Sequence, residues 1–110
     1  PYTVADATFA RSAAVAEELD VPIHVHLHET EDEITESLRR HGVRPLERLR
    51  RLGLTTPRLI GVHGVHFTPG EVALLAREGC HVAHCPSSNL KLASGMARIA
   101  ALLDAGVNVG

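Results

Sequence analysis

The sequence alternates between short apolar segments and segments with helical spacing, and no hairpin turn joins one apolar segment to the next. The apolar segments cover residues 22–30, 58–63, 80–85 and 107–109. Strands separated by helices pair through right-handed crossovers, which makes the sheet parallel. The alternation therefore predicts an α/β chain with four parallel strands, as half of a (β/α)8 barrel or as part of an open doubly wound sheet.

The helical segments carry start and stop signals. Thr30 with Glu33, and Thr68 with Glu71, have the spacing of a capping box, in which two residues at the start of a helix exchange side-chain-to-backbone hydrogen bonds. The stretch from Ser87 to Gly95 is expected to form a loop. Helices are expected over residues 6–19, from 31 to about 40, from 45 to 52, from 69 to 78 and from 97 to 105.

Three successive strands end in side chains suited to chemistry, namely His28–Glu29, His63 and His84. In a (β/α)8 barrel, functional groups gather at the carboxyl ends of the strands. An open sheet that binds a dinucleotide would instead carry a GxGxxG turn after a strand, and this sequence has none. These observations favour the barrel.

The first strand has an unusual polar face. His24, His26 and His28 recur at every second residue, so they share one face of a straight strand. His26 and Glu29 converge only if the chain bends after Leu27 or His28; an imidazole can then hold Zn²⁺ while the carboxylate moves protons. The alternative is that Glu29 merely begins the next helix, where its charge suits the helix dipole.

The second strand offers one further candidate. His63 precedes Gly64 at the end of the strand, and we expect its side chain to face the mouth of the barrel. His66 follows three residues later, a spacing that suits a pair of ligands on a helix. Thr68 caps the next helix, however, so this segment is expected to be a loop and His66 to have no chemical role.

The third strand is flanked by Cys80 and Cys85. Structural zinc sites usually space their ligands as CxxC or HxxxH, so we expect both cysteines to be small core residues. His84 is a candidate for supporting the site or contacting a substrate. Ser88 and Asn89 supply a hydroxyl and an amide that could bind a ligand or close a loop, and ordinary turn chemistry is the alternative.

Charge and composition limit the classes of molecule that the chain is expected to bind. The formal net charge of −2 and the lack of a basic stripe argue against binding to nucleic acid. The sequence also lacks an apolar run of 18 residues, so a membrane-spanning helix is not expected. Two cysteines are too few for a disulfide framework and indicate a cytoplasmic protein with reduced thiols. Because the chain starts at Pro1 and stops just after an apolar segment, we expect residues 1–110 to be a fragment of one barrel domain, truncated at both ends.

Several motifs together resemble the amidohydrolase superfamily, in its chlorohydrolase and aminohydrolase branch. The resemblance is strongest with deaminases that act on 5-methylthioadenosine and S-adenosylhomocysteine. The motifs are PYT at residues 1–3, HVHLHET at 24–30, RPLE at 44–47, VHGVH at 62–66 and HCPSSNLKLASG at 84–95.

The resemblance implies the second half of a TIM-type (β/α)8 barrel that holds one divalent ion, most often Zn²⁺ and sometimes Fe²⁺. His26 matches the metal ligand on the fifth strand, Glu29 the acid–base carboxylate, and His63 the histidine that positions the attacking hydroxide. The remaining ligands, a His-x-His pair and an Asp, are expected outside residues 1–110. The implied reaction is hydrolytic deamination of an aminopurine such as 5-methylthioadenosine or S-adenosylhomocysteine.

Other functions remain open at this point. The same scaffold suits a guanine or 8-oxoguanine deaminase or a triazine chlorohydrolase or aminohydrolase, and a chain lacking the other ligands would be a non-catalytic domain. The expected partner is a small purine-type molecule, with no nucleic acid and no membrane. We expect the full-length protein to form a homo-oligomer.

Overall fold

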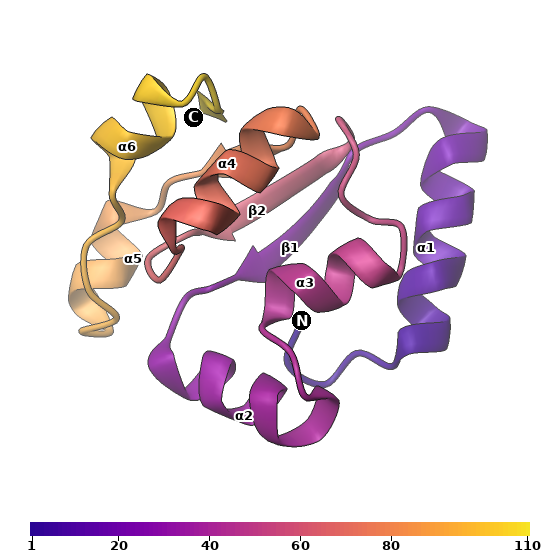
Figure 1. The fold of residues 1–110 in the computed structure, drawn as a ribbon, viewed down its shortest axis with the longest axis horizontal. Coiled ribbons are helices and arrows are strands. Elements are labelled where there is room, and N and C mark those ends of the chain that lie inside the picture. The colour runs from indigo at the N-terminus through magenta and orange to yellow at the C-terminus, as the bar shows by residue number, and fades with distance from the viewer.

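The computed structural model covers residues 1–110 and contains the expected strands and helices, with one helix more than predicted (Figure 1). None of the helices combines the length and the apolar character needed to cross a membrane. In chain order the elements are α1 (Asp6–Leu19), β1 (Ile23–Leu27), α2 (Glu31–His41), α3 (Pro45–Arg51), β2 (Leu59–His63), α4 (Pro69–Arg77), β3 (His81–Ala83), α5 (Pro86–Lys91), α6 (Ile99–Asp104) and β4 (Asn108–Val109).

The four strands form one parallel sheet in the order β1-β2-β3-β4, as the alternation of strands and helices predicts. In the register, Ile23 lies beside Leu59, Ile60 beside His81, and His81 beside Asn108. Each new strand is therefore added beside the previous one, and β1 and β4 are the edges. Parallel strands also bring their carboxyl ends to the same side of the sheet.

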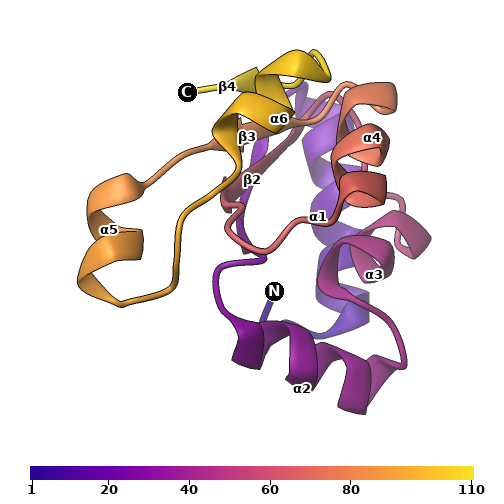
Figure 2. The same cartoon turned by 60° about the vertical axis from the view of Figure 1, so that its left-hand side comes forward.

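Helices cover one face of this sheet. Figures 1 and 2 show α1, α3 and α4 packed along that face, whereas α5 lies away from them beyond the strand ends. The alternating positions Leu27, Leu59 and Val82 point into this layer and are almost completely buried. The core that they form with the helices also includes Phe9, Leu46, Leu49, Leu54, Phe67, Val72, Leu75, Cys80, Leu102 and Val107.

The opposite face of the sheet carries the side chains that point away from the helix layer. His24 and His26 on β1 are exposed, and Ile60 and Val62 on β2 are half-buried. Register pairs His24 with Ile60 and His26 with Val62, so these side chains share one surface. Parallel sheets usually have both faces covered, so this open face is the one that would line the interior of a barrel.

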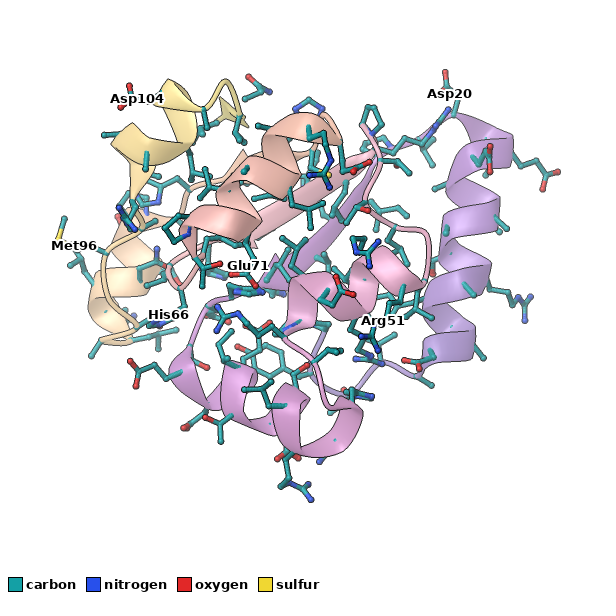
Figure 3. All side chains as sticks on the ribbon, in the orientation of Figure 1. Asp20, Arg51, His66, Glu71, Met96 and Asp104 are labelled. Atoms are coloured by element: carbon teal, nitrogen blue, oxygen red, sulfur yellow. The ribbon has the colours of Figure 1, made fainter.

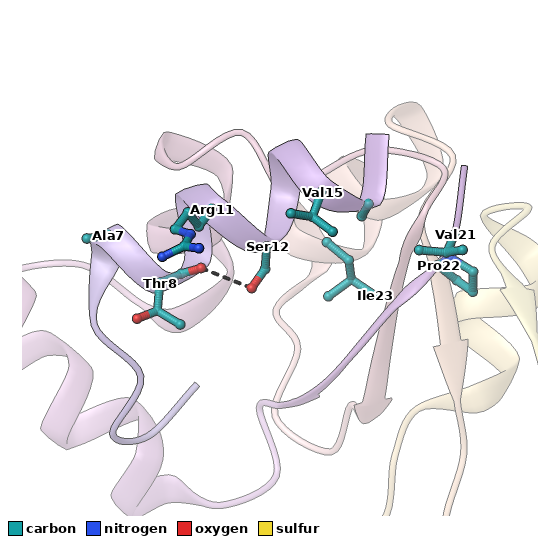
Figure 4. Close-up of a pocket in the computed structure, with 9 residues that line it drawn as sticks. Ala7, Thr8, Arg11, Ser12, Val15, Val21, Pro22 and Ile23 are labelled. Carbon is teal, nitrogen blue, oxygen red and sulfur yellow. Dashed lines mark hydrogen bonds between the residues drawn. The ribbon is translucent and has the colours of Figure 1, made fainter. Parts of the chain in front are cut away.

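A groove runs along α1 where this helix meets the start of the edge strand β1 (Figure 4). Its volume is about 580 Å³, and the Ser12 hydroxyl in its wall donates to the Thr8 carbonyl at 2.9 Å. Ile23, which also lines the groove, is the first residue of β1. The groove is therefore separate from the carboxyl ends of the strands, where the histidines gather.

The loop expected from Ser87 to Gly95 is wrong in its first part, because residues 86–91 form the short helix α5. Pro86 occupies the first helical position, where its fixed φ is compatible with a helix and its missing N–H is not needed. Asn89, a poor former of helix interiors, is buried there because its side chain has a partner outside the helix. Tertiary contact thus outweighs local propensity.

Gly64 offers a stability test at the end of β2. Its φ is +60°, and an added Cβ would lie 2.7 Å from Phe67 Cε2. Gly42 also has a positive φ, +69°, but a Cβ added there would meet nothing within 4 Å. We expect Gly42→Ala to lower the unfolding free energy by about 1–2 kcal/mol, because of backbone strain. Gly64→Ala, as a separate variant, should lower it by ~1–3 kcal/mol more than Gly42→Ala does, because of overpacking. Equal losses in chemical denaturation of the whole protein would contradict this steric account.

A second test concerns the open face and the two edge strands. Unpaired strand edges invite association, and the open face leaves apolar side chains such as Ile60 and Val62 only half-buried. We expect residues 1–110, expressed alone, to associate in size-exclusion chromatography with light scattering. A monodisperse monomer with a cooperative melting transition would show that this sheet needs no further cover.

Candidate active site at the strand ends

The first strand ends because His28 adopts a left-handed backbone conformation, with φ +53°. Such a conformation is uncommon for a residue other than glycine, and it breaks the period-two alternation. The expectation that His24, His26 and His28 share one face is therefore wrong for His28. Its side chain is fully buried on the helix side and stacks on the Phe67 ring, with 4.8 Å between centroids.

The same turn brings Glu29 back toward the open face. The rings of His26 and His63 stack with 5.1 Å between centroids and 23° between planes. His63 Nε2 lies 3.5 Å from Glu29 Oε1. The bend after Leu27 or His28 that the His26–Glu29 spacing requires is thus present, and the three predicted residues form one cluster across β1 and β2.

His63 is held from the far side by α5. Its backbone has φ +78°, and its ring is almost completely buried. The Nδ1 atom lies 2.8 Å from Asn89 Oδ1. Asn89, expected only as a residue that binds a ligand or closes a loop, therefore contacts the candidate histidine directly.

Tyr2 is a member of the cluster that residue patterns did not identify. Its hydroxyl donates to Glu29 Oε2 at 2.8 Å. Partial burial, together with this hydrogen bond, raises the pKa of Tyr2 above its ordinary value. The only signal in the sequence was the place of Tyr2 in the PYT motif, which gave it no role.

Arg48 fixes the segment that carries Tyr2. Its guanidinium is buried and donates to Asp6 Oδ1 at 2.6 and 2.8 Å, to the Val4 carbonyl at 2.6 Å and to the Pro1 carbonyl at 3.2 Å. A charge-assisted network of this kind orders the chain more than single neutral bonds do. The residue patterns did not identify Arg48 either, although it lies next to Leu49 on the inward side of α3.

Glu33 fixes the backbone of the turn. Its carboxylate accepts hydrogen bonds from the His28 N–H at 3.1 Å and the Glu29 N–H at 2.8 Å. The predicted capping box is only half right here: Thr30 Oγ1 accepts from the Glu33 N–H, but Glu33 reaches past Thr30 to the preceding residues. Burial raises the pKa of Glu33, although these hydrogen bonds oppose the shift. The box at Thr68 and Glu71 forms as predicted.

His28 belongs to a separate polar network in the helix layer. Its Nε2 accepts from the Leu46 N–H at 3.1 Å, which leaves the hydrogen on Nδ1, 3.4 Å from the His66 carbonyl. Arg44 binds Glu71 through two nitrogens, at 2.8 and 3.0 Å, and also donates to the His66 carbonyl at 2.7 Å. Figure 3 shows Glu71 and His66 near the same end of α4. Burial lowers the pKa of His28 to about 4.

The remaining candidates lie outside the cluster. The His66 ring contacts the Ser94 carbonyl at 3.0 Å, which agrees with a loop position. His84 lines a cavity of about 540 Å³ between α5 and α6, and its Nδ1 is buried without a partner. Ser88 is half-buried, and no hydrogen bond from its hydroxyl is present.

Cys80 is a buried free thiol, as expected for a core residue, and burial raises its pKa to about 11. Cys85 is a free thiol that is only half-buried.

No three His, Cys, Asp or Glu side chains of residues 1–110 are grouped closely enough to hold a metal ion. His26 nevertheless suits one position of such a site. Its ring is exposed on the open face, has no hydrogen-bonding partner among the other residues, and lies against His63. An imidazole without a hydrogen-bonding partner is a typical zinc ligand, so His26 fits one position of a zinc site.

The whole chain, residues 1–110, matches the amidohydrolase family model. A 5-methylthioadenosine/S-adenosylhomocysteine deaminase of Teredinibacter turnerae is 52% identical over 109 residues, which are 99% of this chain and 25% of the relative. A 5'-deoxyadenosine deaminase of Methanothrix thermoacetophila is 44% identical over 108 residues, covering 98% of this chain and 26% of the relative.

Solved structures give the same result. An adenosine deaminase from Xanthomonas campestris with bound zinc superposes with a TM-score of 0.98 at 51% identity, covering 100% of this chain and 25% of that one. Atrazine chlorohydrolase from Arthrobacter aurescens, complexed with zinc, superposes with a TM-score of 0.93 at 29% identity, covering 96% and 23%.

The chain spans about a quarter of the length of the relatives that it matches. Its four parallel strands and crossover helices correspond to part of the TIM-type barrel of these structures. With a family match over its whole length and the predicted motifs in place, the chain belongs to the amidohydrolase family.

Proposed function

We propose that the full-length protein is a metal-dependent hydrolytic deaminase of an aminopurine such as 5-methylthioadenosine or S-adenosylhomocysteine. The observation that carries this proposal is the convergence of His26, Glu29 and His63 at the carboxyl ends of β1 and β2. The names of the relatives, which are deaminases of 5-methylthioadenosine, S-adenosylhomocysteine and 5'-deoxyadenosine, support the substrate class.

His26 is the residue of this chain that would hold the ion. Zinc is bound in the adenosine deaminase and atrazine chlorohydrolase structures, which supports zinc over iron here. When bound, the ion would supply Lewis acidity that lowers the pKa of a coordinated water. His26 contributes a free nitrogen to that site, and the stacked His63 ring limits the directions in which the His26 ring can turn.

Glu29 is placed to move protons. Its Oε1 faces His63 Nε2 at 3.5 Å and its Oε2 is held by Tyr2 at 2.8 Å, while its backbone N–H is fixed by Glu33. A carboxylate positioned in this way can take one proton from the attacking water and pass it to the purine ring nitrogen. It can then take the second proton from the newly added hydroxyl and pass it to the amino group, which leaves as ammonia. His63 orients the water against the carbon that bears the amino group.

A triazine hydrolase is the second candidate, because the triazine hydrolases and atrazine chlorohydrolase share this fold with TM-scores of 0.92–0.93. Hydrolytic displacement at an electron-poor ring carbon is common to both reactions. The lower identity of these enzymes, 29–30% against 51% for the adenosine deaminase, favours the purine deaminase.

We further propose that residues 1–110 belong to one catalytic barrel domain of a cytoplasmic homo-oligomer.

The substrate proposal predicts the outcome of a substrate panel on the full-length protein. We expect kcat/KM to be highest for adenine nucleosides altered at the 5' position, and lower for guanine and 8-oxoguanine. Ammonia or chloride release measures each reaction. Faster hydrolysis of atrazine than of every purine would favour the second candidate, and no turnover of any compound by metal-loaded protein would indicate a non-catalytic member of the family.

The assignment of roles predicts that substitutions of Glu29 and His26 have different effects on zinc content. Glu29→Gln keeps the size of the side chain but cannot carry a proton, so kcat should fall by about 100- to 10,000-fold while bound zinc stays at the wild-type level. His26→Ala should lose both zinc and activity. Turnover and metal analysis of the same preparations separate the two roles.

Glu31→Gln is the matched control, since Glu31 lies two residues away and is exposed. Its kcat and zinc content should be unchanged. Loss of zinc in Glu29→Gln would make Glu29 a metal ligand, and deamination within a few-fold of wild type would remove it from the proton pathway.

A further inference from the structure

We infer that Asn89 is a positioning residue, whose side-chain oxygen holds His63 in the tautomer with hydrogen on Nδ1 and thereby presents the Nε2 lone pair to the reacting groups. The inference rests on the proposed function in one respect only, namely the role of His63 in orienting water. The hydrogen bond itself, 2.8 Å between His63 Nδ1 and Asn89 Oδ1, is a feature of the fold.

Stacking alone leaves the orientation of the His63 ring undetermined. The ring lies against His26, and a flat contact of this kind tolerates a 180° flip that exchanges Nδ1 with a carbon. The backbone of His63 cannot select the flip either, because it fixes only where the side chain begins. The hydrogen bond to Asn89 is the contact that distinguishes the two orientations.

The chemistry of the bond selects the tautomer. An amide oxygen only accepts hydrogen bonds, so the His63 nitrogen that faces it must carry the hydrogen. In the neutral ring, Nε2 is then an acceptor, and it faces the Glu29 carboxylate, which is also an acceptor, at 3.5 Å. Two acceptors this close together suit a water that lies to one side of the pair and donates one hydrogen to each.

Helix α5 fixes the Asn89 backbone, from which the side chain reaches His63. The Asn89 N–H donates to the Cys85 carbonyl at 2.9 Å, and the Asn89 carbonyl accepts from the Ser94 N–H at 2.9 Å. Asn89 and His63 are 1% and 4% exposed, so water does not compete for the bond. A hydrogen bond between two buried, fixed groups sets geometry more strictly than one at the surface.

The experiment compares two substitutions in the full-length protein. Asn89→Leu keeps the volume but removes the acceptor, and Asn89→Asp keeps an acceptor oxygen. We expect Asn89→Leu to lower kcat by about 10- to 100-fold, the range seen when a metal-ligating histidine loses its hydrogen-bonding partner, with KM and zinc content unchanged. Asn89→Asp should restore kcat to within about tenfold of wild type. Arg77→Leu, at an exposed position of α4 in the helix layer, is the control and should leave kcat unchanged.

A readout that needs no activity separates this inference from the proposed function. In protein labelled with ¹⁵N-histidine, the His63 signals, assigned by their loss in His63→Gln, should show hydrogen on Nδ1 in wild type and in Asn89→Asp. The Asn89→Leu variant should show a mixture of tautomers. That pattern supports the inference even if no purine is deaminated.

Three results would overturn it. One is hydrogen on Nε2 of His63 in the wild type. Another is full kcat in Asn89→Leu. The third is a rise in KM alone, which would make Asn89 a substrate contact.

Discussion

The candidate site depends on the left-handed backbone at the ends of two neighbouring strands, His28 with φ +53° and His63 with φ +78°. In an extended chain, side chains alternate between faces, and a histidine and a glutamate three residues apart cannot meet. A single left-handed residue changes the direction of the chain and places Glu29 beside His63. Such conformations cost of order 1 kcal/mol or more, and here they are maintained by buried hydrogen bonds to the backbone on either side.

The supporting contacts come from the helix layer and from the start of the chain. Glu33 accepts from the backbone N–H groups of His28 and Glu29, and the His28 ring is fixed by the Leu46 N–H. Arg48 ties down the segment that brings Tyr2 to Glu29. Buried charged and polar groups are expensive to bury unless each has a partner, so these residues are best understood as a scaffold for the turn rather than as general sources of stability.

Much of this could be predicted from the sequence. The strands, the parallel order and most helix boundaries follow from hydrophobic spacing and capping signals, which are local. The meeting of His26, Glu29 and His63 also follows once a bend is allowed. The positions of His28, Asn89 and Arg48 could not be predicted, because each depends on contacts between distant parts of the chain. His28 looks like a third member of the histidine face, Asn89 like a turn residue, and Arg48 like a surface charge, until the fold supplies their partners.

The way in which Glu29 is anchored has a consequence for how activity is inferred from fold. The turn is secured through the Glu29 backbone, by Glu33, while the Glu29 side chain contributes little beyond its bond to the Tyr2 hydroxyl. On the role proposed for Glu29, architecture and reactivity would reside in different atoms of the same residue. A single substitution at this position would then stop the proposed reaction without unfolding the barrel. Resemblance of fold would, on the same proposal, be weaker evidence of activity than the identity of this one side chain.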